Sequence, residues 1–379
     1  MSKFYYKTGY SLKDVSIIPS MTSRVESRKE VDVLIDVCGK KRFPVIVAPM
    51  SSVVDLQSYK AFNDAGYACV IPRSVSTVEG LSLKERLKYA EDNFVSVSLD
   101  EAESIANEEI EIDVSKKTHI CIDIAQGAMI RLINICVSLK DKYKSSIVIM
   151  SGNIANPETY SVYCQSGIDY VRVSIGTGKR CATTDITGIG MPMATLLDEI
   201  NDIKSRRIDN GLRYTKVIAD GGIDDIKDIN KALVLGADLV MSGYLFAKTE
   251  EACGDIMYAN SENDVYKGVY WTYKEGDSYG SVHSTNDKHF LSFFKKHFRN
   301  YYGMSTEKAQ KEFGKTKIKP SEGIEKIVSV DYTLKTLTNK IEASLRSCMS
   351  YLDALTIPEM SENGQVIIMG GSSLEALKK

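Results

Sequence analysis

The chain has 379 residues, of which 43% are hydrophobic and 26% charged, a composition typical of a soluble globular protein with one large domain or two smaller ones. Its formal net charge of −2 provides no overall field that would attract nucleic acid or an anionic membrane. No apolar run is long enough to span a membrane, and the amino terminus lacks the apolar stretch of a signal peptide, so we expect a cytoplasmic protein with no nucleic-acid or membrane partner.

Short β-branched runs alternate with helix-compatible stretches through the first two thirds of the chain. The predicted strands are 44–48, 68–71, 94–97, 119–123, 147–150, 170–173, 216–219 and 239–242. The predicted helices between them include 56–65, 83–93, 130–142, 157–166, 192–206 and 226–235. A (β/α)₈ barrel requires this many strand–helix repeats, whereas a doubly wound open sheet usually has fewer strands. We therefore predict an α/β fold, a (β/α)₈ TIM barrel, as one domain over residues 1–379.

Polar side chains and glycines follow most of the predicted strands. They lie at 49–52, 72–74, 123–127, 152–153, 174–181, 220–222 and 243–244. In barrels of this kind the active site lies at the carboxyl ends of the strands. Glycines after the last two predicted strands are typical of a site that binds phosphate through backbone N–H groups, so we predict a phosphorylated small molecule as ligand.

One cysteine lies in a glycine-rich turn after the sixth predicted strand. Gly176 and Gly178 allow the backbone to adopt positive φ and approach a ligand closely, and Lys179 and Arg180 favour the thiolate of Cys181. We therefore predict that Cys181 is a nucleophile. The eight cysteines include no C-x-x-C pair and the four histidines no H-E-x-x-H, so we expect neither a disulfide framework nor a catalytic zinc, and most other thiols should be buried.

The segment 251–300 interrupts the strand–helix alternation with many tyrosines and a basic aromatic run at 293–299. Basic residues interleaved with aromatics can bind nucleic acid, but the alternation at 265–273 equally fits a β-hairpin insertion laid over the barrel, which we favour. Polar and glycine-rich sequence predicts a less ordered C-terminal tail over 355–379, which runs over the surface or to a neighbouring subunit.

Short motifs along nearly the whole chain resemble those of the IMP dehydrogenase/GMP reductase family, in the family's order. They are Ala48-Pro-Met50, Gly152-Asn153, the Gly-x-Gly-x-x-Cys turn ending at Cys181, Gly188-Ile-Gly190, Ala219-Asp-Gly-Gly222, Tyr302-Gly-Met304, Ser321-Glu-Gly323 and Leu345-Arg-Ser347. The resemblance implies a (β/α)₈ barrel that binds a purine nucleoside monophosphate and a nicotinamide cofactor. It also implies that the cysteine thiolate adds to C2 of the purine and forms a covalent thioimidate.

Several features resemble the reductase branch, which converts GMP to IMP and ammonia with NADPH. The predicted strands leave no interval for the regulatory domains frequent in the dehydrogenases. The flap, at 301–325, is short and lacks the Arg-Tyr pair of the dehydrogenase flap. The run from Cys181 to Pro192 has the reductase order of Thr followed by Gly-x-Gly-x-Pro. IMP dehydrogenase, which converts IMP to XMP with NAD, and a non-catalytic purine nucleotide-binding protein are the alternatives.

The resemblance assigns roles position by position. Cys181 is the nucleophile, and Thr183 with Glu322 relays the proton that makes the 2-amino group leave as ammonia. Asp220 resembles the carboxylate that holds the ribose hydroxyls. The other substrate-binding positions are Gly221, Gly222, Ser242, Gly243, Gly303, Met304, Ser305, Lys319, Ser321 and Gly323.

The resemblance also implies a cofactor and a cation. NADPH is expected, with NADH as the alternative, and its positions are Ser27, Arg28, Arg73, Asp123, Ile124, Ala125, Ile175 and Gly176. Ser27 and Arg28 would reach across from a neighbouring subunit, because the family forms tetramers. A monovalent cation, usually potassium, is held in the family by the cysteine turn, and the matching positions are Gly176, Gly178, Cys181 and Thr184.

Some of these residues have a structural alternative, and some positions depart from the family pattern. Asp220 could cap the following helix, and Glu322, Arg73 and Arg28 could be ordinary surface charges. Ser51 stands where both branches have aspartate. The other departures are Pro72-Arg73 for His-Lys, Ser174 and Tyr244 for glycine, Lys179 for a small phosphate-binding residue and Lys319 for arginine. These departures leave room for a modified purine nucleotide or a different cofactor.

Overall fold

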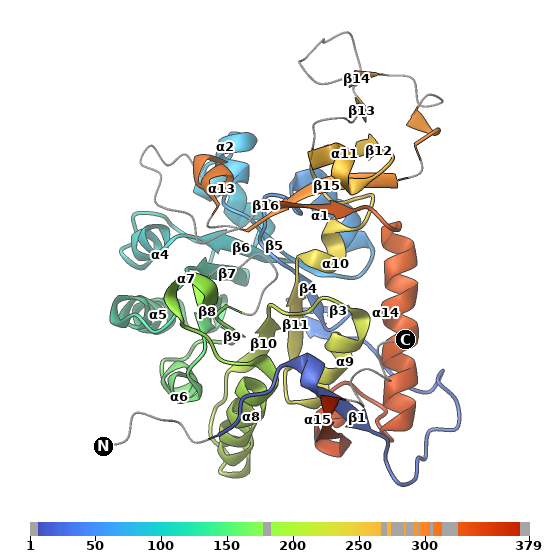
Figure 1. Ribbon diagram of the computed structural model, residues 1–379. Helices are drawn as coiled ribbons and strands as arrows, with labels where there is room; N and C mark the ends of the chain where they lie inside the picture. Colours follow the sequence, from blue (N-terminus) through green and yellow to red (C-terminus); the bar gives the residue numbers. More distant parts are fainter. Residues whose placement is uncertain are drawn as a thin grey trace.

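The computed structural model describes residues 7–176, 183–266, 271–273, 284–285, 291–294, 296–303, 306–312 and 325–371. Eight parallel strands close into a barrel, which confirms the predicted (β/α)₈ fold (Figure 1). In chain order they are β4 (Val45–Val47), β5 (Ala68–Ile71), β6 (Phe94–Val97), β7 (Thr118–Asp123), β8 (Ile147–Ile154), β9 (Tyr170–Val173), β10 (Lys216–Asp220) and β11 (Leu239–Ser242). Strands β4 and β11 lie side by side and close the barrel. Each of these strands overlaps a predicted one.

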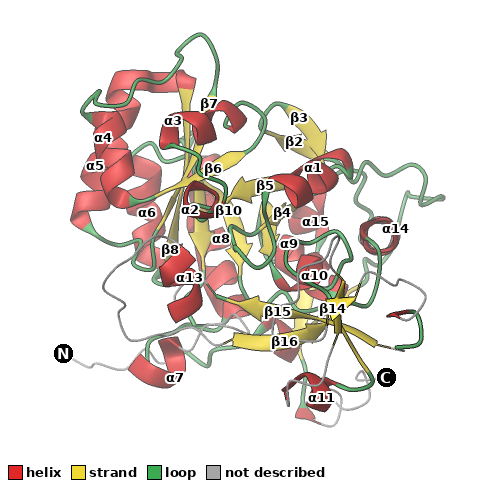
Figure 2. Cartoon of the chain, turned by 90° about the horizontal axis from the view of Figure 1, so that it is seen from above, coloured by secondary structure: helices red, strands yellow, loops and turns green. Residues whose placement is uncertain are grey.

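Helices that follow the strands surround the barrel (Figure 2). The longer ones are α1 (Leu56–Asp64), α4 (Leu99–Ala106), α5 (Ile130–Tyr143), α6 (Pro157–Gln165), α8 (Met193–Asp209) and α9 (Ile226–Val234). Shorter helices are α2 (Val75–Val78), α3 (Leu83–Arg86), α7 (Thr183–Thr187) and α10 (Tyr244–Ala247), with 3₁₀ turns η1 (Leu12–Asp14), η2 (Leu87–Tyr89) and η3 (Lys144–Ser146). Capping boxes fix where α1 and α4 begin. The side chains of Asp55 and Ser98 each accept a hydrogen bond from the backbone N–H of the residue three positions further along the chain.

One helix is shorter than the sequence predicts. A helix over 83–93 was expected, whereas α3 ends at Arg86 and η2 follows it. The side chain of buried Asn93 accepts hydrogen bonds from Arg42 Nη1 at 2.9 Å and from the Cys69 N–H at 2.8 Å. These contacts fix residue 93 next to β5, so tertiary packing takes precedence over the local helical pattern.

The strand side chains alternate between two apolar layers. Those that point inward form a core inside the barrel, and those that point outward pack under the helices. The inward set includes Ile46, Ala68, Val70, Phe94, Cys121, Met150, Tyr170, Ile218, Leu239 and Met241. Burial on both faces explains why the strands are continuous apolar runs in the sequence. A hairpin of β2 (Ile35–Val37) and β3 (Lys40–Arg42) adds Val37 and Cys38 to the inner core.

A second sheet lies over the carboxyl end of the barrel, and we call it the cover sheet. Its strands are β12 (Met257–Ala259), β13 (Trp271–Tyr273), β14 (Ser284–Thr285), β15 (Lys296–Tyr302) and β16 (Glu325–Ser329), in the order β14-β13-β12-β15-β16. Within the segment 251–300, β12 pairs antiparallel with β13 and β15, while helix α11 (Glu262–Tyr266) takes the first residues of the alternation at 265–273. Residues 267–270 of the predicted hairpin lie outside the described residues. In Figure 1 the cover sheet stands above the barrel.

The C-terminal part of the chain is more regular than the sequence predicts. After α13 (Glu307–Glu312) and α14 (Leu334–Tyr351), the chain forms α15 (Glu359–Asn363) and β17 (Gln365–Ile368). Strand β17 pairs antiparallel with β1 (Val15–Ile18) near the other end of the sequence. The expectation of a less ordered tail is therefore wrong for 359–368, because its pairing partner is too distant in sequence for a local pattern to reveal.

Candidate active site

Four neighbouring strands bring charged and polar side chains together at the carboxyl end of the barrel. Arg172 of β9 lies between Asp123, at the end of β7, and Asp220, at the end of β10. Its Nη1 donates to Asp123 Oδ1 at 2.6 Å, and its Nε and Nη2 lie 2.9 and 2.8 Å from Asp220 Oδ2. Asn153 of β8 donates its Nδ2 to the same Asp220 oxygen at 2.8 Å. We call these four residues the Arg172 network.

The network is largely shielded from solvent. The side chains of Arg172, Asp123 and Asp220 are 9%, 10% and 14% exposed. Burial alone would lower the pKa of Arg172, but the carboxylates of Asp220 and Asp123 hold it well above its usual value. Two carboxylates share one guanidinium, so the network keeps an excess of negative charge at the barrel mouth. Carboxylate oxygens accept hydrogen bonds from hydroxyls, which suits the ribose of a nucleotide.

The structure gathers several predicted cofactor residues around Asp123. Arg73, in the loop after β5, places its Nη2 3.5 Å from the Asp123 carbonyl oxygen. Ile124 is partly exposed and Ala125 is exposed, directly after β7. A carboxylate beside an arginine fits the ribose hydroxyls and phosphates of a nicotinamide dinucleotide.

The predicted phosphate position after β11 is closely surrounded by side chains. A Cβ added to Gly243 would press against Met50 Sδ and lie 3.0 Å from the Tyr301 hydroxyl oxygen, so a larger residue would displace these side chains. Gly221 and Gly222, after β10, have φ of 110° and 72°. The Ser242 hydroxyl donates to the Ile223 carbonyl at 3.2 Å, so its side chain links these two loops.

The start of the cysteine turn is tightly folded. Ser174, which stands where glycine is common, has φ 144°, and Gly176 has φ 79°. A Cβ added to Gly176 would clash with Thr184 Oγ1, so the turn folds back onto α7. Two of the four predicted cation positions, Gly176 and Thr184, therefore lie side by side, and Ile175 precedes them in the same turn. Oxygen atoms of such a turn fit a hard monovalent cation.

Other predicted residues of the turn and the flap lie outside the described residues. They are Gly178, Cys181, Met304, Ser305, Lys319, Ser321, Glu322 and Gly323. Thr183 is described as the first residue of α7, and Gly303 follows the last residue of β15. Their roles stay predictions.

Ser27 and Arg28 do not join the barrel mouth of their own chain. The Arg28 carbonyl accepts a hydrogen bond from Arg346 Nη1 of α14 at 3.2 Å. Helix α14 begins at Leu334, beside the cover sheet. Arg346 lies about 18 Å from Leu334 along the axis of this helix. A cofactor role for Ser27 and Arg28 therefore requires a neighbouring subunit.

Sequence reasoning missed three residues of the site. Arg172 is a charged residue inside an otherwise apolar strand that the structure buries throughout, and this was the signal that could have identified it. Asn153 lies in a predicted strand-end segment but had been given no role. Tyr301, whose hydroxyl lies 3.5 Å from Met50 Sδ, had no feature that distinguished it from the other tyrosines.

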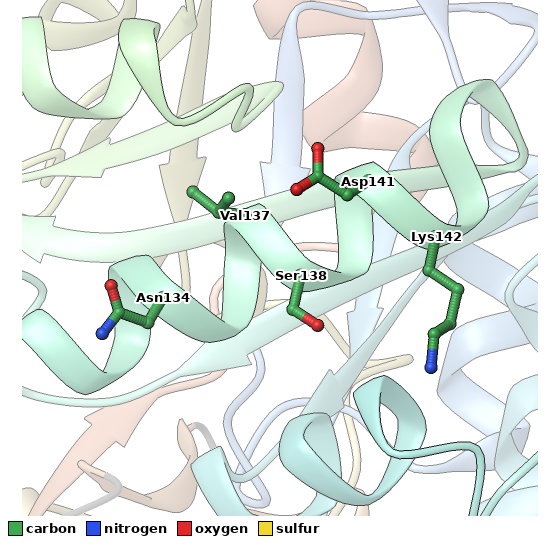
Figure 3. Close-up of a pocket in the computed structure, with 5 residues that line it drawn as sticks. All are labelled: Asn134, Val137, Ser138, Asp141 and Lys142. Carbon is green, nitrogen blue, oxygen red and sulfur yellow. The ribbon is translucent and has the colours of Figure 1, made fainter.

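Elsewhere in the described chain, the features that could form a ligand site lie outside the barrel mouth. A hollow of about 480 Å³ lies on the outer face of α5, lined by Asn134, Val137, Ser138, Asp141 and Lys142 (Figure 3). These residues belong to one helix outside the barrel, away from the strand ends. Within the ranges described above, no group of three or more His, Cys, Asp or Glu side chains could hold a metal ion. No helix there is both long and apolar enough to cross a membrane.

Burial protects most of the described thiols. All of the described cysteines except Cys348 are buried. Burial raises the pKa of Cys38, Cys121, Cys136 and Cys348 to about 12, and it also raises the pKa of Cys69 and Cys253. These thiols stay protonated at neutral pH, whereas the thiolate is the nucleophile.

We therefore expect iodoacetamide to label the native protein at about one cysteine, Cys181, at neutral pH. Intact-mass analysis followed by peptide mapping measures the site and the number of labels. The Cys181→Ala variant should remain almost unlabelled on the same timescale. Equal labelling of the variant and the wild type would contradict the assignment of Cys181 as the reactive thiol.

Comparison with known proteins agrees with this geometry. A family model described as the IMP dehydrogenase / GMP reductase domain matches residues 9–377. The inosine-5'-monophosphate dehydrogenase of Chlorobaculum parvum is 29% identical over 256 residues, which are 67% of this chain and 46% of that protein. That of Methanocaldococcus jannaschii is 30% identical over 251 residues, 66% of this chain and 46% of that protein. That of Borreliella burgdorferi is 29% identical over 273 residues, 68% of this chain and 57% of that protein.

The chain spans about half the length of the curated relatives it matches. The domain model, in contrast, covers nearly all of this chain, from the residues before β1 to those after β17. The closed barrel and the polar residues at its carboxyl end agree with that match. The chain therefore belongs to the IMP dehydrogenase/GMP reductase family.

Proposed function

We propose that this protein is a GMP reductase, an oxidoreductase that converts GMP to IMP and ammonia with NADPH. The observation that carries the proposal is the Arg172 network. In this network the guanidinium of Arg172 binds two carboxylates. Asp220 is the one assigned to the nucleotide ribose, and Asp123 is the one assigned to the cofactor. Ligands bound to these two carboxylates would lie next to each other, as hydride transfer between them requires.

The reductase direction is supported by the chain between the strands and after β15. Strands β4 to β11 follow one another without an interval long enough for a separate regulatory domain. The segment between Gly303 and Glu322 is short and contains no Arg-Tyr pair that would activate water for a dehydrogenase. Glu322 together with Thr183 supplies a proton relay suited to the departure of ammonia.

In this reaction the Cys181 thiolate attacks C2 of GMP and forms a carbon–sulfur bond. Thr183 and Glu322 deliver a proton to the 2-amino group, which leaves as ammonia, so that a thioimidate on Cys181 remains. NADPH, when bound, supplies the hydride that C2 requires. Cys181 then departs as thiolate and releases IMP. Asp220 orients the ribose during these steps, and Gly221, Gly222 and Gly243 leave the backbone accessible to phosphate.

The cofactor and cation residues complete the proposal. Arg73 and Asp123 would hold NADPH, and a neighbouring subunit of a tetramer would contribute Ser27 and Arg28. Gly176 and Thr184 would share a potassium ion with Gly178 and Cys181, which would order the turn that aims the sulfur atom.

The test is to mix the protein with GMP and NADPH and to follow the absorbance of reduced nicotinamide together with ammonia release. We expect both signals to change in equal molar amounts, because one hydride is consumed for each ammonia. Ammonia release without cofactor oxidation, or neither signal, would contradict the proposal.

IMP dehydrogenase activity is the second candidate, and the names of the curated relatives favour it. Under that alternative the protein would produce NADH from IMP and NAD, and it would hydrolyse the thioimidate to XMP. NADH formation from IMP and NAD, with no oxidation of NADPH by GMP, would transfer the assignment to this activity.

A further inference from the structure

Four side chains join the loop after β4 to the end of β15 and to helix α13, and we call them the β15 anchor. They are Ser51, Ser52, Tyr302 and Glu312. The Tyr302 hydroxyl donates to Glu312 Oε1 at 2.8 Å. The Ser52 hydroxyl donates to the Tyr302 carbonyl oxygen at 3.1 Å and accepts from the Tyr302 N–H at 3.3 Å. Tyr302 is thus held by both its backbone and its side chain.

The anchor contains polar atoms that stability alone does not explain. Tyr302 is 6% exposed and Ser52 is 3% exposed. Ser51 Oγ and Glu312 Oε2 are both buried, and neither has a hydrogen-bond partner among the described residues. A buried oxygen without a partner destabilises the folded state, so its presence in a native structure calls for an explanation. A role in positioning the neighbouring site provides one.

The direction of the central hydrogen bond is fixed by its surroundings. Burial raises the pKa of Tyr302, and the hydrogen bond and the charge of Glu312 raise it further. The nearby Ser51 hydroxyl acts on the pKa of Tyr302 in the opposite direction. Tyr302 therefore stays a neutral donor and Glu312 the acceptor. Lys308 of the same helix lies with its Nζ 4.6 Å from the centroid of the Tyr302 ring, a second contact between α13 and β15.

Tyr302 therefore has a serine on the β4 side and a carboxylate on the α13 side. We propose that Glu312 is a positioning residue, whose carboxylate on α13 holds the Tyr302 hydroxyl and so fixes Tyr302 and the neighbouring Gly303 at the end of β15. In Figure 1, α13 lies at the same end of the barrel as β15 and β16. The inference rests on the proposed function, because that function assigns Gly303 to the nucleotide site.

The experiment measures GMP binding by isothermal titration without cofactor, so that no turnover is needed. Glu312→Leu removes the acceptor and Tyr302→Phe removes the donor, whereas Glu312→Gln keeps an acceptor oxygen. The double variant Ser51→Asp/Glu312→Leu moves the carboxylate to the β4 side of Tyr302, where Ser51 acts on the tyrosine hydroxyl. Tyr160→Phe is the matched control, because it removes a 2.7 Å hydrogen bond to the Thr215 carbonyl in the outer helical layer. Circular dichroism gives the folded fraction of each variant.

We expect Glu312→Leu and Tyr302→Phe to raise the Kd for GMP about tenfold, since a hydrogen bond to a charged group is lost. Glu312→Gln and the double variant should keep a Kd for GMP within about threefold of the wild type. Tyr160→Phe should lower thermal stability without changing the Kd, which separates a structural loss from a positioning one.

The inference is overturned if Glu312→Leu binds GMP as tightly as the wild type, or if the double variant binds as weakly as Glu312→Leu. If the wild type itself binds neither GMP nor IMP, the proposed function fails, and this inference fails with it. The two failures are distinguishable, because binding by the wild type alone tests the proposed function, whereas the variants test the role of Glu312.

Discussion

Replacement of Cys181 by alanine should lower kcat by about 10⁴-fold or more, while the Kd for GMP changes little. The reason is that alanine cannot form the covalent bond to C2, whereas the contacts to ribose and phosphate remain. Burial keeps the pKa of several other cysteines high, so their thiols do not offer a substitute nucleophile. Steady-state rates with GMP and NADPH measure the loss, and isothermal titration measures the binding.

Cys348→Ala is the matched control, because Cys348 is a partly buried thiol on α14, outside the barrel. This variant should keep wild-type rates. Mass spectrometry of the wild type quenched during turnover should show a purine adduct on the peptide that contains Cys181. Residual turnover in Cys181→Ala at a tenth of the wild-type rate, or an adduct on another cysteine, would remove Cys181 from the mechanism.

The barrel could be predicted from the sequence because its strands are short apolar runs buried on both faces. Each of them, from β4 to β11, is separated from the next by a stretch long enough for a crossover. Asp123 and Asp220 could be placed at the site because a parallel barrel brings its carboxyl strand ends to one face. Local periodicity and topology were sufficient for both inferences.

Contacts between segments distant in sequence could not be predicted in this way. Asn93 ends a helical pattern because it binds Arg42 and the backbone of Cys69. Strand β17 forms because β1 is available to pair with it. The bond between Tyr302 and Glu312 depends on where α13 packs, and no local pattern records that. Arg172 is the exception, since a charge within a buried apolar strand was visible in the sequence.

Replacement of Arg172 by methionine should destabilise the protein by about 3–5 kcal/mol, because it leaves two mostly buried carboxylates without their shared cation. The side chains of Asp123 and Asp220 are only 10% and 14% exposed, so solvent cannot replace the guanidinium fully. Urea denaturation followed by circular dichroism measures the change. We also expect the Kd for GMP to rise, since Asp220 loses the donors that orient its Oδ2.

The triple variant Asp123→Asn/Arg172→Met/Asp220→Asn separates stability from function. Removing both charges together with the arginine should recover most of the lost stability, because replacing a whole buried ion pair is often close to neutral. It should not recover GMP binding, since an amide at position 220 both donates and accepts and no longer presents a carboxylate to the ribose hydroxyls. If Arg172→Met alone is as stable as the wild type, the two carboxylates are hydrated in solution and do not depend on Arg172. The network would then not be what places GMP and the cofactor next to each other.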